Sequence, residues 1–242
     1  MADTTAAPTG GRALFVRQSS GLVDLATDGG LNFAAFSFFA SAGFLLVVAV
    51  ALFCGDTIAS EASWSSLRYL LAAPVPRARL LRQKMIVALG YAAVAVVTFP
   101  AMSLLAGTVV FGWHPLRLPA TQIELPYGTA LARAGIALVY VMITLLVVAG
   151  LAFLLSVSTD SPLGAVGGAV GLVIVSNILD AVTALGSWRE ILPSHWQFAW
   201  LDAFSAQLSW GGMVEGAAVS VSYALVLFAL AFRHFRRKDI VS

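Results

Sequence analysis

Five long apolar stretches, separated by polar segments, run along the chain. They cover residues 33–53, 85–111, 134–157, 163–185 and 214–232. Each reaches roughly the 20 residues that a helix needs to cross the hydrocarbon core of a bilayer. Apolar residues make up 60% of the sequence and charged residues 11%, against averages of about a half and a quarter in globular domains. We therefore expect an all-α, polytopic integral membrane bundle with five transmembrane helices.

The first 30 residues differ from the rest because they are polar, small and rich in Gly, Ala and Thr. They contain no basic region followed by an apolar one, so we expect no signal peptide there. The apolar positions between Leu14 and Leu25 suit a short helix lying at the interface. We therefore divide the chain into a polar or interfacial N-terminal segment, 1–30, and a transmembrane domain, 31–242.

The longest polar interruption between the spans, residues 55–84, is strongly basic. It carries five cationic residues against two acidic ones: Arg68, Arg77, Arg79, Arg82 and Lys84 against Asp56 and Glu61. Short loops rich in Lys and Arg stay on the cytoplasmic side of a membrane. A second basic cluster, Arg233 to Lys238, follows the last span. We therefore expect this loop and the C-terminus in the cytoplasm, and the N-terminus on the opposite side of the five spans.

The loop also has a helical pattern. Leu67, Leu70 and Leu71 recur at helical spacing, and Pro74 then ends the helix because proline has no N–H to donate. The chain restarts at Arg77 as a basic helix. The pattern predicts a helix, a proline elbow and a second helix facing the cytosol. From the residues alone, a cytoplasmic loop with no further role is the simpler interpretation.

This loop resembles the first cytoplasmic loop of type-2 ABC exporter permeases. That family has an acidic residue, then W-G-T-L-R-x-L-L, P-x-x-R and a lysine that opens the next span. The matching residues here are Glu61, Trp64, Leu67, Arg68, Leu71, Pro74, Arg77 and Lys84. The chain departs from the pattern at Ser65 and Ser66, where the family usually has Gly-Thr. The resemblance implies that the matching residues dock on a separate ATPase subunit and transmit its closure to the spans.

The resemblance also implies the surroundings of the protein. These would be two cytoplasmic ATPase subunits that hold ATP and Mg, a second permease subunit, identical or homologous, and the bacterial inner (plasma) membrane. The expected function is export of a hydrophobic or amphipathic substrate such as a drug, lipid or peptide. Relatives have six spans, so either this chain lacks the first one or its start lies upstream of Met1. The alternative from another class is a non-transport membrane anchor or assembly factor.

The sequence gives little support to an enzyme. Neither of the two lysines, Lys84 and Lys238, ends a G-x-x-x-x-G-K-[ST] loop, so we expect no ATP bound by this chain. The three histidines lie outside the spans, and Cys54 is the only cysteine. We therefore expect no metal site, no cofactor and no catalytic residues in this chain, and no nucleic-acid binding.

The fourth span carries two overlapping G-x-x-x-G pairs: Gly164, Gly167, Gly168 and Gly171. Small residues at this spacing let a neighbouring helix approach closely. The neighbour belongs either to this chain or to a second permease. In the turn before this span, we expect Asp160 or Ser161 to cap the helix, with proline in its first turn.

The outer end of the same span is polar, with Ser176, Asn177 and Asp180 close together. Ser176 and Asp180 are one turn apart and share a face. A carboxylate in an apolar span usually faces protein or water, so we expect these three residues in the transport pathway or a dimer interface. The alternative is that Asp180 reaches the outer headgroups.

Five of the six tryptophans fall in the two segments assigned to the outside: Trp113, Trp188, Trp196, Trp200 and Trp210. Aromatic residues are enriched at membrane–water boundaries. Between Pro193 and Leu208, Trp196, Trp200 and Phe204 recur every four residues, which predicts a short amphipathic helix at the outer face. In relatives such an element borders the exit of the pathway. A simple interfacial anchor fits the pattern equally well.

Overall fold

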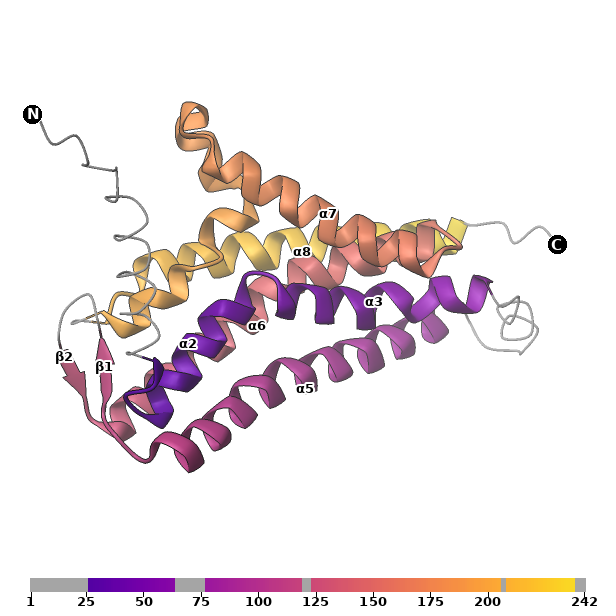
Figure 1. The fold of residues 1–242 in the computed structure, drawn as a ribbon. Coiled ribbons are helices and arrows are strands. Elements are labelled where there is room, and N and C mark those ends of the chain that lie inside the picture. The colour runs from indigo at the N-terminus through magenta and orange to yellow at the C-terminus, as the bar shows by residue number, and fades with distance from the viewer. Residues whose placement is uncertain (1–25, 64–76, 119–122, 206–207, 238–242) are drawn as a thin grey trace, which may run out of the picture.

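The structure is a computed structural model that describes residues 26–63, 77–118, 123–205 and 208–237. The helices of this part run side by side in an elongated bundle (Figure 1). They are α2 (Gly30–Ala42), α3 (Leu45–Ser63), α5 (Arg77–Phe111), α6 (Tyr127–Ser158), α7 (Pro162–Ala181) and α8 (Gly211–Arg237). Among the described residues, five helices, α3 and α5 to α8, are long and apolar enough to cross a membrane. The expectation of an all-α, polytopic bundle with five spanning helices is confirmed.

The first predicted span, residues 33–53, is divided in two. Helix α2 ends at Ala42 and α3 begins at Leu45. Gly43 lies between them, and glycine inside a helix costs about 1 kcal/mol relative to alanine. Two residues earlier the Ser41 hydroxyl donates to the carbonyl of Phe38 at 3.1 Å, a local bond that often bends helices. Both features weaken the helix at this point, where one apolar stretch forms two helices.

Several helices are longer than the apolar stretches that predicted them. Helix α3 continues to Ser63 and α5 begins at Arg77, so both extend into the predicted loop 55–84. Helix α6 likewise begins at Tyr127 rather than near residue 134. A hydropathy window finds only the length that matches the hydrocarbon core, whereas helical hydrogen bonds continue into polar sequence. Helix α7 is shorter than predicted and ends at Ala181.

Helices α3, α6 and α8 form the centre of the bundle, with α7 on one side and α2 and α5 on the other (Figure 1). Helices α2 and α5 approach closely at Gly30, where a Cβ atom would lie 2.6 Å from the backbone nitrogen of Thr108. Ser161 caps α7, as predicted, by accepting a hydrogen bond from the N–H of Gly164 at 3.2 Å. The largest fully buried side chains include Leu46, Ile58, Leu81, Val96, Phe153, Val157 and Trp200.

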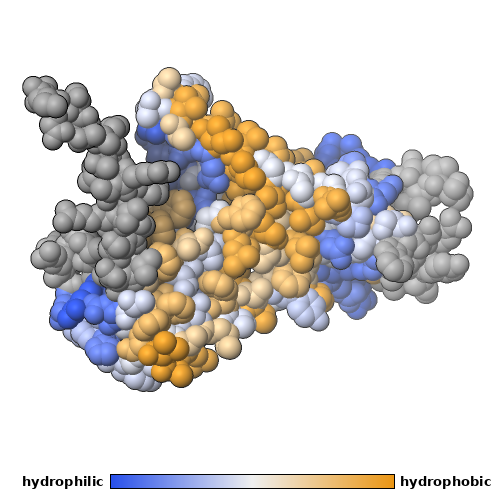
Figure 2. Space-filling view, viewed as in Figure 1, coloured by the Kyte–Doolittle hydropathy of each residue, from blue (hydrophilic) through white to orange (hydrophobic). Residues whose placement is uncertain are grey.

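The bundle has two ends that we name by their connections. The loop end contains the ends of α3, α6 and α8 and the start of α5, and the hairpin end contains the starts of α2, α6 and α8 and the end of α5 (Figure 1). Figure 2 shows hydrophobic residues over the middle of the bundle and hydrophilic residues toward both ends. This banding is the pattern expected of a protein that crosses a bilayer.

A β-hairpin joins α5 to α6. Strand β1 (Leu116–Leu118) pairs antiparallel with β2 (Ile123–Leu125). The Arg117 guanidinium donates to the carboxylates of Asp28 at 2.7 Å and Glu124 at 2.9 Å. The hydrogen bond to Asp28, and to a lesser extent that to Glu124, raises the pKa of Arg117 above its ordinary value. The Asn32 side chain also bonds the backbone of Arg117, so the hairpin holds the start of α2.

The predicted amphipathic helix between Pro193 and Leu208 is corrected by the structure. The chain from Thr183 to Phe204 forms short 3₁₀ segments, of which the last two occupy the predicted range: η1 (Thr183–Ile191), η2 (Pro193–Trp196) and η3 (Ala199–Phe204). Proline opens η2, and Gly186 inside η1 has a φ of 53°, so neither position continues a regular helix. Trp200 is buried against Phe38 with ring centroids 5.2 Å apart. The apolar side of this region therefore packs on the bundle instead of forming one continuous interfacial face.

Candidate functional site

Two of the coupling residues predicted from the sequence, Glu61 and Arg77, lie at the loop end. Glu61 lies in the last turn of α3, and its carboxylate pairs with the ammonium group of Lys84 on α5. Both side chains are mostly buried, with exposed fractions of 23% and 20%. This ion pair joins the two helices that flank residues 64–76. Arg77 is the first residue of α5, whereas Trp64, Leu67, Arg68, Leu71 and Pro74 lie outside the described residues.

A second contact connects the loop end to the centre of the bundle. Ser156, near the end of α6, is fully buried. Its hydroxyl oxygen accepts hydrogen bonds from the backbone N–H groups of Ile58 at 3.0 Å and Ala59 at 3.1 Å. The contact ties the last turns of α3 to α6. Sequence reasoning missed it, although a serine within an apolar span is a signal for hydrogen bonding between helices.

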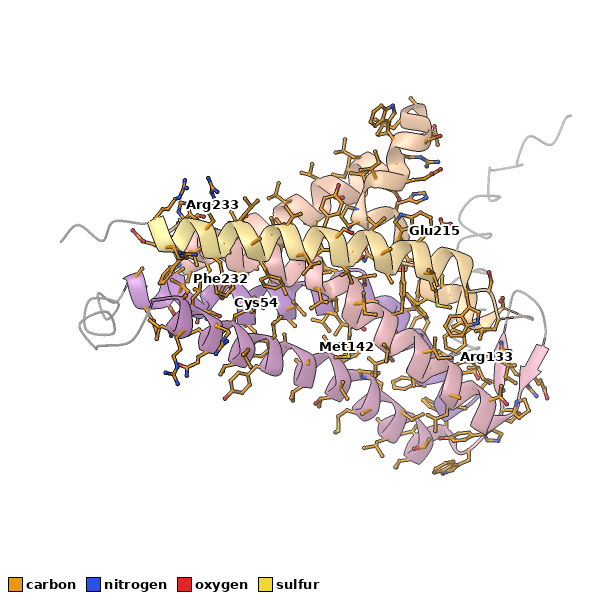
Figure 3. All side chains as sticks on the ribbon, turned by 180° about the vertical axis from the view of Figure 1, so that it is seen from behind. Cys54, Arg133, Met142, Glu215, Phe232 and Arg233 are labelled. Atoms are coloured by element: carbon orange, nitrogen blue, oxygen red, sulfur yellow. The ribbon has the colours of Figure 1, made fainter. Side chains whose placement is uncertain are left out.

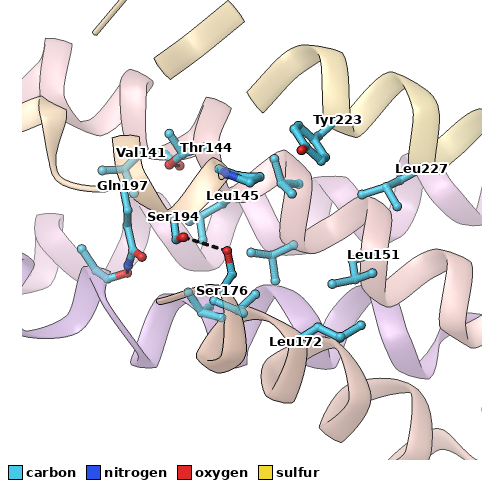
Figure 4. A pocket seen from close by; sticks show the side chains of 16 residues that line it. Val141, Thr144, Leu145, Leu151, Leu172, Ser176, Ser194, Gln197, Tyr223 and Leu227 are labelled. Atoms are coloured by element: carbon cyan, nitrogen blue, oxygen red, sulfur yellow. Dashed lines mark hydrogen bonds between the residues drawn. The ribbon is translucent and has the colours of Figure 1, made fainter. Parts of the chain in front are cut away.

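Between the middle and the hairpin end, helices α3, α6, α7 and α8 enclose a cavity of about 260 Å³, which we call the polar-rimmed cavity (Figure 4). Segment η2 lies over one side of it. Aliphatic side chains form most of its wall, and five polar side chains complete it: Thr144, Ser176, Ser194, Gln197 and Tyr223. Mostly apolar cavities with a few polar groups are typical of small-molecule sites, and this volume is just below their range of about 300–1,000 Å³.

The structure separates the three polar residues predicted at the end of α7. Ser176 lines the polar-rimmed cavity, and its hydroxyl oxygen lies 2.7 Å from that of Ser194 on η2 (Figure 4). Asp180 does not line this cavity. Its carboxylate lies 2.7 Å from Nδ1 of His195, and its backbone carbonyl accepts a hydrogen bond from Arg189 at 3.2 Å. Asn177 is half-buried and is not among the residues that line the cavity.

Sequence reasoning missed the partners of Ser176 and Asp180. Ser194 and His195 follow Pro193 directly, and Gln197 comes two residues later, where its amide donates to the carbonyl of Ala42 at 3.4 Å. The position of the histidines outside the spans served only to argue against a metal site. The sequence did contain a signal: polar side chains gather between Trp188 and Trp196, in the segment that follows α7.

The predicted glycine faces of α7 have different surroundings. A Cβ atom at Gly168 would lie 3.1 Å from the Leu155 side chain, so this glycine supports packing on α6. Gly164 contacts the Ser161 cap of its own helix. At Gly167 and Gly171, no described residue comes within 4 Å of the added atom. One of the two glycine pairs therefore packs within the chain, and the other faces outward.

Charged groups also mark the ends of α8. Arg233 lies toward the loop end and Glu215 toward the hairpin end (Figure 3). Among the described residues, no group of three His, Cys, Asp or Glu side chains is arranged to hold a metal ion.

Comparison with known proteins gives one match. The model of a family described as "Protein of unknown function (DUF2705)" matches residues 12–241, which is nearly the whole chain. None of the curated proteins compared with the chain matches it.

Proposed function

This chain belongs to the DUF2705 family, and we propose that it is the membrane-spanning permease subunit of an ATP-driven ABC exporter. The observation that carries the proposal is the loop sequence from Glu61 to Lys84, which resembles the ATPase-docking loop of type-2 ABC permeases. The ion pair between the first and last residues of this segment supports it. An interaction between the two ends of a docking loop would make α3 and α5 respond together to a push from outside the membrane.

Force at the loop end would reach the rest of the bundle through Ser156. Its hydroxyl ties α3 to α6, and α6 in turn provides Thr144 and neighbouring residues of the polar-rimmed cavity. In the proposed cycle, ATP binding closes two cytoplasmic ATPase subunits, the loop moves with them, and α3 and α6 shift together. The chain itself supplies no catalysis. ATP and Mg are held by the ATPase subunits.

The polar-rimmed cavity suits a hydrophobic or amphipathic substrate. Its wall is mostly aliphatic, while hydroxyl groups and the Gln197 amide offer both hydrogen-bond donors and acceptors. A drug, lipid or peptide with one polar end could satisfy both parts of the wall. The cavity is smaller than most such molecules, so transport requires the helices to separate around it, as they would in an open state.

The charge distribution supports an orientation with the loop end in the cytoplasm. Cationic residues near the start of α5 (Arg79, Arg82, Lys84) and in the last turns of α8 (Arg233, Arg236, Arg237) lie at this end. Basic residues favour the cytoplasmic face. We therefore propose a multi-pass protein of the plasma membrane with its C-terminus in the cytoplasm, assembled with a second permease subunit, identical or homologous.

Reconstitution tests the proposal. We expect a P-loop ATPase to be encoded beside this chain. The two proteins are co-purified and incorporated into liposomes with a lipophilic rhodamine dye as the transport probe. We expect the chain to stimulate ATP hydrolysis and dye movement, and an ATPase with its P-loop lysine replaced by alanine to support neither. If the chain changes neither the rate of ATP hydrolysis nor dye movement, the proposal is overturned. Binding without ATP-dependent dye movement would favour a membrane anchor instead.

A further inference from the structure

A groove of about 340 Å³ extends between α3 and α5 from the loop end toward the middle of the bundle, where the two helices run side by side (Figure 1). We call it the interhelical groove. Among the described residues, it has no lining residue in common with the polar-rimmed cavity. Its wall contains residues of both helices, including Phe53, Thr57, Gln83, Lys84, Val87 and Tyr91.

The wall of the interhelical groove changes from polar to apolar along its length. On α3, Thr57 lies one turn nearer the loop end than Phe53. On α5, Lys84 lies about 10 Å nearer the loop end than Tyr91, at 1.5 Å per residue. The rings of Phe53 and Tyr91 lie nearly parallel with centroids 6.1 Å apart, and Leu80 is the apolar exception at the polar end. The groove is therefore amphipathic in the same direction as a phospholipid of the leaflet at the loop end.

The polar end of the groove offers hydrogen-bond donors. The ammonium group of Lys84 is bonded to Glu61 alone among the described residues, and an ammonium group has three N–H donors. Two donors of Lys84 therefore remain for an acceptor in the groove. The exposed amide of Gln83 adds two more. Phosphate oxygens are acceptors that lysine commonly binds.

The charges around the polar end favour an anion. Arg79 and Arg82 are exposed on the turn of α5 that precedes Lys84. The carboxylates nearby are that of Glu61, which is paired with Lys84, and that of Asp56, which is exposed beside Thr57 on α3. Three cations thus face two carboxylates. A headgroup that ends in a cation would be repelled by the two arginines, whereas an uncharged glycerol headgroup would not.

We propose that the interhelical groove binds an anionic glycerophospholipid of the leaflet at the loop end. The lipid phosphate accepts hydrogen bonds from the ammonium of Lys84 and the amide of Gln83, and one acyl chain passes Val87 toward the rings of Phe53 and Tyr91. Charged side chains avoid hydrocarbon, which places Lys84 at the headgroups and Tyr91 about 10 Å deeper, among the acyl chains. Basic pockets between spanning helices on the cytoplasmic side bind such headgroups in other membrane proteins. The site does not depend on the proposed export function, because it requires neither an ATPase nor the polar-rimmed cavity.

Lipids that differ only in their headgroup test the proposal. Full-length protein in dodecyl maltoside micelles is titrated with phosphatidylglycerol or with phosphatidylcholine of the same acyl chains, and the shift in Tm gives the apparent Kd. We expect about fivefold to tenfold tighter binding of phosphatidylglycerol, as a surface cation provides. Equal binding of the two lipids would overturn the proposal. Glycerol 1-phosphate carries the phosphate without acyl chains and should not shift Tm. A shift as large as that with phosphatidylglycerol would identify a soluble phosphate as the ligand instead of a lipid.

Two neighbouring residues of α5 locate the site. Val87 lines the interhelical groove and is 55% exposed, whereas Ile86 is 58% exposed and is not a lining residue. Val87→Trp should fill the groove and weaken the binding of phosphatidylglycerol at least tenfold, and Ile86→Trp should bind as the wild type does. Equal weakening in both variants would overturn the proposal. Wild-type binding in Val87→Trp would show that the lipid binds elsewhere, for example beside the basic end of α8.

The role of the ammonium group is tested separately. Lys84→Met keeps an unbranched side chain and removes the charge, so the preference for phosphatidylglycerol over phosphatidylcholine should disappear. The tryptophan pair gives its result even if Lys84→Met does not fold, because neither Ile86 nor Val87 takes part in the ion pair with Glu61. A folded Lys84→Met protein that keeps the full preference would exclude Lys84 as the phosphate ligand and overturn the proposal.

Discussion

The hydroxyl oxygen of Ser156 lies 3.0 Å from the backbone nitrogen of Ile58 and accepts its hydrogen bond, so a side chain of α6 holds the main chain of α3. The next backbone N–H, that of Ala59, bonds the same oxygen at 3.1 Å. Both partners lie in the buried core. Displacing α3 along its axis would break both bonds at once, so the two helices are expected to move as a unit near the loop end.

Ser156→Ala should destabilise the protein by about 1–3 kcal/mol, because it removes the acceptor of two buried N–H groups. Thermal unfolding in detergent, followed by circular dichroism, measures the change. Ser158→Ala is the matched control, since Ser158 is exposed and bonds only within its own helix, to Leu154 at 2.7 Å. If both variants unfold at the same temperature, the hydroxyl of Ser156 contributes nothing to the packing of α3.

Reversing the charge of Glu61 should separate α3 from α5 at the loop end. Glu61→Lys brings two cations together, and Lys84→Glu in the same chain restores an attractive pair. We expect chain-stimulated ATP hydrolysis to fall in the single variant and to recover in the double variant. If ATP hydrolysis does not recover in the double variant, Glu61 acts through a partner other than Lys84.

Substitutions of the residues proposed to contact the ATPase directly should uncouple ATP hydrolysis from the membrane subunit. Trp64→Ala removes the aromatic anchor, and Arg68→Glu reverses a charge. Each should abolish substrate-stimulated ATP hydrolysis while the protein stays in the membrane fraction. Arg79→Gln is the control, because Arg79 is exposed at the start of α5 and one contact to lipid phosphate is worth only about 1 kcal/mol. Normal stimulation in the first two variants would remove the coupling role.

Filling the polar-rimmed cavity should block dye transport. Ser176→Phe adds a large side chain to its wall, whereas Ile178→Phe on the same helix enlarges a side chain that is 60% exposed. We expect rhodamine transport to fall at least tenfold in the first variant and to remain normal in the second. ATP hydrolysis without dye serves to check that both complexes are assembled. Unchanged transport in Ser176→Phe would exclude this cavity from the pathway.

Cysteine labelling tests the orientation. In a Cys54→Ser background, Thr9→Cys should react with an impermeant thiol reagent added outside intact cells, because five spans and a cytoplasmic loop leave the N-terminal segment outside. Ala78→Cys should react only after the membrane is opened. Cys54 is the only cysteine in the sequence, so in this background any labelling comes from the introduced residue. Reaction of both positions from the same side contradicts the five-span topology.

Hydropathy was sufficient to predict the spanning helices, because only long apolar segments satisfy the bilayer. It could not predict the break at Gly43, where a glycine follows the Ser41 hydroxyl bonded to the carbonyl of Phe38. The four-residue spacing of Trp196 and Trp200 favoured a helix, but packing of Trp200 on Phe38 prevailed and left short 3₁₀ turns. The contacts of Ser156 join residues nearly a hundred positions apart, and no local pattern encodes such a distance.

The 35 residues of α5 make a helix about 52 Å long at 1.5 Å per residue, while the hydrocarbon core is about 30 Å thick. Even at a tilt of about 40°, near the upper limit for such helices, only about 39 Å of it fits inside. Roughly 13 Å must lie outside the hydrocarbon core. The segment from Arg77 to Lys84 rises about 11 Å and carries the charges that avoid lipid. The basic start of α5 therefore lies outside the hydrocarbon core, where its cations can contact lipid phosphates or a protein at the membrane surface.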